Sequence, residues 1–271
     1  MTYRISRFFA LTIYAIAIIV PCSIVILGVF KKDNEIYTQP LALPKQWSFS
    51  NFSRLIHEGD VFTPFKNSMI VTVCSVVATL ALASAASYAI SRMITITGKI
   101  LFLLFALGLA IPGQVNIIPI YILFTNLHLT NSLVGLILIN IAVTLPISIF
   151  ILTTFFRNIP KELFEVANVD GATTFRTFRS IALPLAKPAM GATGIFLFVI
   201  CWNDLLYPLM LITQLDKKTL PLTLIDFRGE YATSYSMLFT AILVASVPLI
   251  VMYVFMQKSF VAGLTAGAVK G

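Results

Sequence analysis

The chain has 271 residues and a formal net charge of +8, and 58% of its residues are hydrophobic while only 11% are charged. A soluble domain of average composition carries about 25% charged residues. The composition therefore excludes an ordinary soluble protein and predicts a membrane protein.

Six ranges of the sequence are long and apolar enough to cross a bilayer, whose hydrocarbon core of about 30 Å needs roughly 20 residues of helix. In chain order they are residues 8–30, 67–90, 100–124, 132–156, 188–212 and 236–257. Five of them contain no charged residue, and the fifth range contains Asp204. We predict an all-α, polytopic membrane protein with six transmembrane helices in a single domain covering residues 1–271.

The first range could be a signal peptide, but its length exceeds that of a typical hydrophobic signal region. Pro21 stands before Cys22, where a lipoprotein signal requires a small residue. We expect an uncleaved first span. The three cysteines lie in different apolar ranges and are predicted to pack as small hydrophobic residues rather than to form disulfides.

The second range has small residues at helical spacing, including Ala81, Ala85 and Ala89. Small side chains let helix backbones approach closely in lipid, which predicts a central position for this helix. Five of the six ranges contain proline, and proline bends a helix. Bent helices that line a cavity suit a transporter.

The positive charges predict the orientation of these helices. If the N-terminus is inside, lysine and arginine greatly outnumber acids in the inner segments, while the outer segments 31–66 and 213–235 are nearly balanced. This positive-inside bias predicts that both termini and the loop 157–187 are cytoplasmic. It also argues against a nucleic-acid partner, because the basic residues follow the membrane sides rather than forming one stripe.

The loop 157–187 has the residues of two short helices. We expect Asn158 to cap the first helix, with Pro160 and Glu162 in its opening turn. Gly171 can adopt a positive φ and end that helix, and residues 172–180 are predicted to form a second helix that stops at Leu183-Pro184. The pattern predicts a rigid helix-turn-helix, and a helix lying in the lipid headgroups is the alternative.

A second candidate site lies in the fifth range, at Trp202, Asn203 and Asp204. An ionised side chain inside a membrane is costly and usually faces a polar cavity or a partner. An indole face can stack on a sugar ring and a carboxylate accepts hydroxyl hydrogen bonds, so these residues are candidates for a substrate pathway. Structural packing or gating is the alternative role. We find no metal constellation, catalytic triad or nucleotide-binding motif, and we expect neither enzymatic activity nor a cofactor bound by this chain.

The loop also carries a spaced motif. It reads Glu165-Val166-Ala167, three further residues, Gly171, nine further residues, and Ile181-Ala182-Leu183-Pro184. This resembles the EAA loop of ATP-binding-cassette (ABC) importer permeases, with Val166 in place of an alanine as its one departure. Ile111-Pro112-Gly113-Gln114, Trp202-Asn203-Asp204 and the tail from Gly263 to Gly271 extend the likeness over essentially the whole chain. Together they resemble the shorter, second permease of carbohydrate importers of the maltose type.

The resemblance implies a MetI-like ABC permease fold and a bacterial inner or plasma membrane location. It implies that the chain forms half of a heterodimeric pore with a second permease, and that an extracytoplasmic solute-binding protein delivers a sugar. Two partner ATPase subunits would bind ATP and Mg²⁺ and receive the loop. The residues carried over to this coupling role are Glu165, Val166, Ala167, Asp170, Gly171, Ala172, Ile181, Leu183 and Pro184.

A different class of protein remains as the alternative. An ion-coupled secondary transporter could use Asp204 as its ion-binding carboxylate, and six spans would then be half of a twelve-span carrier. Such a carrier has no use for an ATPase-docking loop. Dependence of uptake on ATP rather than on a proton gradient distinguishes the two.

Overall fold

The computed structural model describes residues 2–57, 60–93, 95–227 and 234–268, with the backbone alone for residues 2, 3, 5 and 256–268. The regular elements of this described part are all helical, which confirms the predicted fold class. Five of these helices are long and apolar enough to cross a membrane, or six if one bent pair forms a single span. The chain divides into two compact units, residues 1–66 with 219–249, and residues 67–218 with 250–271.

The first unit is tied together by polar side chains that satisfy backbone groups. Its helices are α1 (Thr2–Gly28), α2 (Asp33–Thr38), α3 (Ser50–His57), α12 (Leu220–Asp226) and the first part of α13 (Tyr235–Ala268). The Asn51 side-chain amide donates to the carbonyls of Val29 and Lys31 at 2.8 and 2.9 Å. Asp33 accepts a hydrogen bond of 2.7 Å from the Ser236 amide, which would otherwise be an unsatisfied donor at the start of α13.

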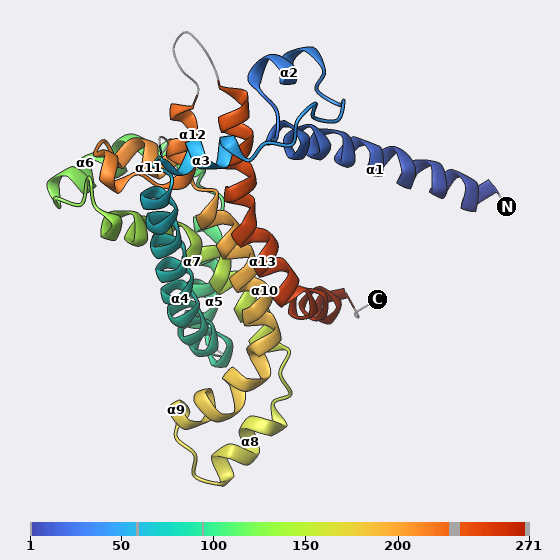
Figure 1. Ribbon diagram of the computed structural model, residues 1–271. Coiled ribbons are helices and arrows are strands. Elements are labelled where there is room, and N and C mark those ends of the chain that lie inside the picture. The colour runs from blue at the N-terminus through green and yellow to red at the C-terminus, as the bar shows by residue number, and fades with distance from the viewer. Residues whose placement is uncertain (1, 58–59, 94, 228–233, 269–271) are drawn as a thin grey trace. The chain divides into compact units, whose positions relative to one another are not determined.

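The second unit contains most of the apolar helices and the whole of the loop 157–187. Its elements are α4 (Phe62–Arg92), α5 (Ile96–Gly108), η1 (Gly113–Asn116), α6 (Ile117–Asn126), α7 (Leu133–Arg157), α8 (Glu162–Val169), α9 (Thr174–Thr177), the π-helix η2 (Phe178–Ala182), α10 (Leu183–Trp202), α11 (Leu206–Leu211) and η3 (Leu215–Lys217). Helix α7 packs against both α5 and α10. Helices α8 and α9 stand at one end of α4, α7 and α10 (Figure 1).

Helices α4 and α7 meet along a line of hydroxyl groups. The Thr79 and Thr144 hydroxyls are 3.2 Å apart, and the Ser87 hydroxyl donates to the Ile149 carbonyl at 3.2 Å. Several hydroxyls also bond within their own helix, as Thr144 does to the Asn140 carbonyl at 2.6 Å. The buried face of α4 carries these hydroxyls, and its central position stays a prediction. Of the small residues on which that prediction was based, Ser84 and Ser87 are buried, whereas the alanines at 81, 85 and 89 are exposed.

Two of the predicted spans are broken rather than continuous. The range 100–124 is occupied by α5 and by η1 with α6, which meet at an angle of 83° across a break that contains Pro112. The range 188–212 contains α10, which begins earlier at Leu183 and ends at Trp202, followed by the short helix α11. Apolar composition predicted the presence of both segments but gave no signal for a change of direction within them.

Candidate coupling site

The first arm of the loop 157–187 is helix α8. Lys161 is its N-cap, without a side-chain hydrogen bond, and Glu162 and Glu165 lie in its first turn, where the helix dipole favours acids. The prediction that Asn158 caps this helix was wrong. Asn158 instead closes α7, and its side-chain amide donates to the Thr154 carbonyl at 3.0 Å.

Gly171 ends α8 with a positive φ of 70°, as the sequence predicted. The Gly171 amide donates to the Asn168 carbonyl at 3.1 Å, and the Ala172 amide donates to the Ala167 carbonyl at 2.9 Å. These two bonds form a Schellman motif, which satisfies the last carbonyls of the helix and reverses the chain. The turn brings the second half of the spaced motif back toward α8.

The second arm is short and runs directly into a long helix. Thr173 caps α9 by accepting a hydrogen bond of 3.3 Å from the Arg176 amide, and the chain continues through η2 into α10. The predicted stop at Leu183-Pro184 was therefore wrong. Pro184 lies in the first turn of α10, directly after the π-helix. Proline has no amide to donate to the preceding turn, and the π-helix directly before it is where the regular hydrogen-bond pattern of the helix changes.

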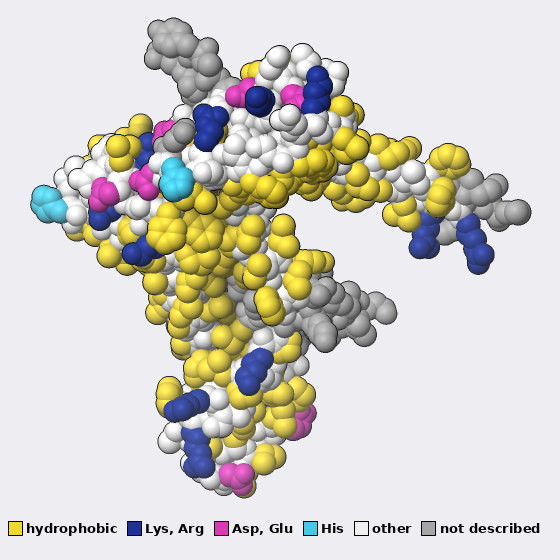
Figure 2. All heavy atoms as spheres, viewed as in Figure 1, with side chains coloured by type: hydrophobic (Ala, Val, Ile, Leu, Met, Phe, Trp, Pro, Cys, Tyr) yellow, Lys and Arg dark blue, Asp and Glu magenta, His cyan; other side chains and the backbone are white. Residues whose placement is uncertain are grey.

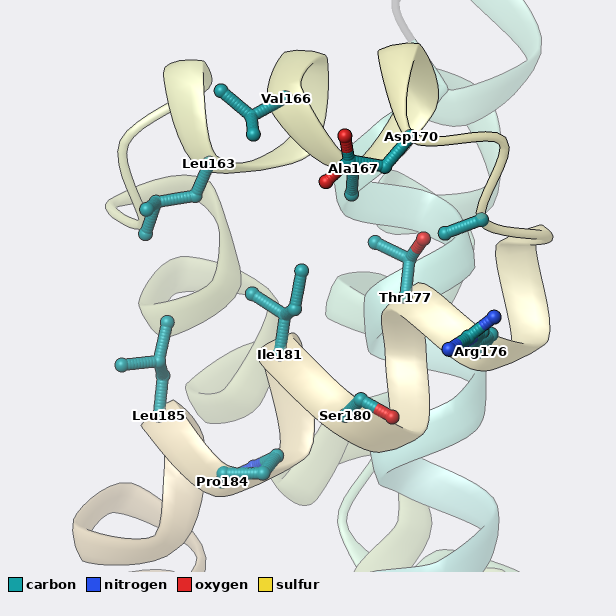
Figure 3. Close-up of a pocket in the computed structure, with 11 residues that line it drawn as sticks. Leu163, Val166, Ala167, Asp170, Arg176, Thr177, Ser180, Ile181, Pro184 and Leu185 are labelled. Carbon is teal, nitrogen blue, oxygen red and sulfur yellow. The ribbon is translucent and has the colours of Figure 1, made fainter.

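The two arms enclose a groove of about 560 Å³ (Figure 3). Leu163 and Ala167 of α8 lie on one side of it, opposite Ile181 and Thr177 (Figure 3). Six of the nine predicted coupling residues line the groove: Val166, Ala167, Asp170, Ala172, Ile181 and Pro184. The other three, Glu165, Gly171 and Leu183, are absent from its lining. The structure thus brings the two separated halves of the motif together around one feature.

The outward side of the two arms is apolar and carries acids. Val166, Val169 and Phe175 are 61, 87 and 69% exposed, and Glu165 is also exposed. Figure 2 shows charged side chains around α8 and α9, below a yellow, uncharged zone of the helices. Val166 replaces an alanine of the motif at an exposed position, so its larger side chain adds apolar surface without crowding the interior.

The inward side of α8 is anchored in the core. Phe164 and Ala167 are buried, and Phe164 belongs to a cluster that includes Tyr88, Phe156 and Ala182. The Arg92 guanidinium lies over the Phe164 ring, with Cζ 3.8 Å from the ring centroid. Sequence reasoning missed Tyr88 and Arg92. The only signal in the sequence was that Tyr88 and Arg92 are four residues apart, on the same membrane side as the loop 157–187. That signal does not show that they contact Phe164.

The second candidate site lies at the far end of α10 and in the break that follows it. Trp202 is 2% exposed and stacks on Phe198, with ring centroids 5.8 Å apart and an interplanar angle of 9°. The Asn203 side-chain amide donates to the Val199 carbonyl at 2.8 Å. Asp204 is half-buried, and its Oδ1 accepts a hydrogen bond of 3.3 Å from the Tyr207 amide. These three residues finish one helix and start the next, and their role in a substrate pathway stays a prediction.

The Asp204 carboxylate also faces a polar side chain of α7. The Asn140 side-chain amide interacts with this carboxylate. However, neither Asn140 Nδ2 nor Asp204 Oδ2 has a partner with hydrogen-bonding geometry. Asn140 is fully enclosed by protein, so the two groups form an incompletely satisfied polar contact between α7 and the break after α10.

Residues 79–265 match the family model described as "Binding-protein-dependent transport system inner membrane component". This range contains both arms, the groove, and the buried residues Phe164 and Ala167 of α8. The chain belongs to this family.

Proteins similar to this chain include transporter permeases, some of them from named sugar transport systems. A putative ABC transporter permease protein, ORF2, from Caldicellulosiruptor sp. is 36% identical over 97% of this chain and 96% of its own length. The diacetylchitobiose uptake system permease protein DasC of Streptomyces coelicolor is 36% identical, over 89% of this chain and 88% of its own. The arabinooligosaccharides transport system permease protein AraQ of Bacillus subtilis is 32% identical over 99% and 96%.

A solved structure shares the fold. A chain of a bacterial ABC transporter involved in the import of the acidic polysaccharide alginate superposes with a TM-score of 0.84. The two chains are 20% identical, and the match covers 96% of each. The fold of this multi-pass membrane protein is therefore the MetI-like ABC permease fold.

Proposed function

We propose that this protein is the permease subunit of an ATP-driven ABC importer for sugars or oligosaccharides, and that α8 with its groove is the part that receives work from partner ATPase subunits. The observation that carries the coupling role is the architecture of α8. It is a short helix, closed by a Schellman turn and anchored inward by Phe164, that presents Val166, Val169 and Glu165 outward. The substrate class rests on the family and on its sugar-transporting relatives.

The exposed face of α8 fits a partner with an apolar socket. An exposed apolar patch on a small projecting element marks a protein interaction site rather than a stable free surface. Phe175 of the second arm extends the patch. Burying these side chains on a partner would remove them from water, at about 25 cal/mol per Å² of apolar area.

The whole assembly follows from the same proposal. A second permease completes the pore, two ATPase subunits bind ATP and Mg²⁺, and an extracytoplasmic solute-binding protein delivers the sugar. The positive-inside bias supports an orientation with both termini and the loop in the cytoplasm of a bacterial cell. Closure of the ATPase pair would then move α8 and alternate the access of the pore.

Charge and polarity changes on the exposed face of α8 test the coupling role. In proteoliposomes containing the assembled complex, we expect Glu165→Lys or Val169→Asp to reduce ATP-driven sugar uptake at least tenfold. Membrane insertion should be unchanged, because both side chains are exposed and make no core contact. Copurification of the ATPase should fall in parallel.

Lys187→Glu is the matched control. It is an equally large charge change at an exposed position of α10 that does not line the groove, and it should leave uptake within about twofold of the unaltered protein. Uptake at the unaltered rate in both α8 variants would refute the coupling role of α8.

A further inference from the structure

Helices α7 and α10 are covalently continuous with the two arms, whereas α4 meets them through side chains. Residues 158–161 join α7 to α8, and η2 joins α9 to α10. Helix α4 ends at Arg92, beside the buried base of α8. Any displacement of α8 is passed to α7 and α10 along the backbone, but it reaches α4 through the contacts of Tyr88 and Arg92.

Arg92 contacts two elements at once. Its Cζ is 3.8 Å from the centroid of the Phe164 ring in α8, and its Nη2 donates to the Phe156 carbonyl in the last turn of α7 at 3.1 Å. A guanidinium is planar, so it can stack on a ring with its face and donate hydrogen bonds from its edge. The negative end of the α7 dipole further favours a cation at that carbonyl.

Tyr88, one turn earlier on α4, completes the contact. Its ring centroid is 5.1 Å from Phe178 of η2, 6.0 Å from Phe156 and 6.2 Å from Phe164. Phe156, Phe164 and Tyr88 are all buried, so this group is packed closely. Tyr88 and Arg92 therefore join α4 to three other elements, α7, α8 and η2.

We propose that Arg92, supported by Tyr88, is a positioning residue that makes α4 follow α8 during transport, an inference that rests on the proposed coupling role of α8. The Arg92–Phe164 contact is the point where force passes from the docked helix α8 into α4. A dispersive contact alone would let α8 slide along α4. The cation over the ring, held in turn by the α7 carbonyl, fixes their relative position.

The test uses the complete complex in proteoliposomes, with the sugar that the unaltered complex takes up fastest from a panel of di- and oligosaccharides. The variants are Arg92→Met, which keeps an unbranched apolar stem but removes the charged guanidinium, Phe164→Leu, and the double variant. We expect Arg92→Met to retain the ATPase subunits and basal ATP hydrolysis. The sugar imported per ATP hydrolysed should fall about 5- to 30-fold, the range that corresponds to one or two kcal/mol.

The remaining comparisons separate transmission from folding. The double variant should fall no further than the worse single variant, because both changes remove one contact. Arg92→Lys should recover part of the loss. Arg157→Met is the matched control: Arg157 also lies over a ring, Phe102, at 4.5 Å, but in a contact between α7 and α5 that does not involve α8. It should leave transport per ATP unchanged.

Unchanged transport per ATP in Arg92→Met, additive losses in the double variant, or an equal loss in Arg157→Met would each overturn the proposal. Loss of the ATPase subunits from Arg92→Met would also overturn it, because the residue would then serve docking rather than transmission. Failure of the coupling role itself has a different signature. In that case Glu165→Lys would transport normally, whatever the Arg92 variants do.

Discussion

Gly171 shows how a single residue sets the geometry of the coupling site. Its φ of 70° lies in the left-handed region, and a Cβ placed there meets no atom within 4 Å. A substitution is therefore strained only by the backbone and not by a neighbour. For an L-residue that strain is roughly 1–2 kcal/mol, with asparagine tolerated better than alanine or valine.

Because the strain at Gly171 comes from the backbone alone, the effects of two substitutions there can be predicted. Gly171→Ala should destabilise the turn by about 1 kcal/mol, because the residue must hold a positive φ. We expect uptake per ATP to fall severalfold, measured in proteoliposomes. Gly171→Asn is larger but tolerates this φ, so it should remain closer to the unaltered protein. If Asn impairs coupling more than Ala, size at a docked surface rather than backbone conformation governs this position.

At the residue scale, the sequence predicted a feature that depends on backbone conformation alone. It did not predict features that depend on which partner a side chain binds. The positive φ of Gly171 follows from its position after an amphipathic segment. Asn158 could bond to the end of α7 or to the start of α8, and no local pattern distinguishes the two. Arg92 and Phe164 are far apart in sequence, and only the packing of α4 against the loop brings them together.

At the scale of elements, the break between α10 and α11 gives Asp204 a structural role. Its Oδ1 accepts the Tyr207 amide in the way an N-cap residue does at the first turn of a helix. Asp204→Ala removes this acceptor, and we expect a loss of about 0.5–2 kcal/mol in the free energy of unfolding. The midpoint of thermal unfolding of the detergent-solubilised complex measures the change.

Asp204→Asn separates the cap from the charge. An amide oxygen can still accept the Tyr207 amide, so stability should be close to that of the unaltered protein. Altered uptake in this stable variant would assign the charge to the substrate pathway. Unchanged uptake in Asp204→Asn, together with a destabilised Asp204→Ala, would reduce Asp204 to a capping residue.

At the scale of elements, an apolar pattern predicts a span but not whether the span is straight. Residues 100–124 are apolar enough to read as one span, yet α5 and α6 differ in direction by 83°. Hydropathy reports how long an apolar segment is, and it carries no information about the direction of the helix axis. Pro112 predicts a bend, but its angle depends on the helices packed around it.

At the scale of the whole molecule, composition alone left open whether ATP or an ion gradient drives uptake. The family and the fold distinguish these two energy sources. As a permease of an ABC importer, the protein should support uptake that vanadate or ATP depletion abolishes. Uptake should continue when a protonophore collapses the proton gradient and ATP is maintained, because no ion moves with the sugar. Transport by proteoliposomes with ATP enclosed provides the measurement.

A proton- or sodium-coupled carrier would show the reverse dependence. In that case uptake would stop with the protonophore, or without sodium, and would not be inhibited by vanadate.

The sequence was sufficient to predict a membrane protein and to identify its EAA motif, because both depend on composition and spacing. It could not place the groove, because the groove depends on how a Schellman turn and a π-helix return Ile181 and Pro184 to α8.

Hydroxyl groups of α7 and α10 have a consequence for how the chain enters the membrane. Thr144, Ser148 and Thr193 each donate to the carbonyl four residues earlier in their own helix, at 2.6 to 2.8 Å. Each hydroxyl thus has an acceptor within its own helix while that helix lies alone in lipid during synthesis, before any neighbour arrives. These three hydroxyls need no neighbouring helix during insertion, whereas the Thr79–Thr144 contact and the bond from Ser87 to the Ile149 carbonyl form when α4 and α7 later associate. A charged pair at the same positions would give similar recognition, but each partner would resist leaving the translocon alone.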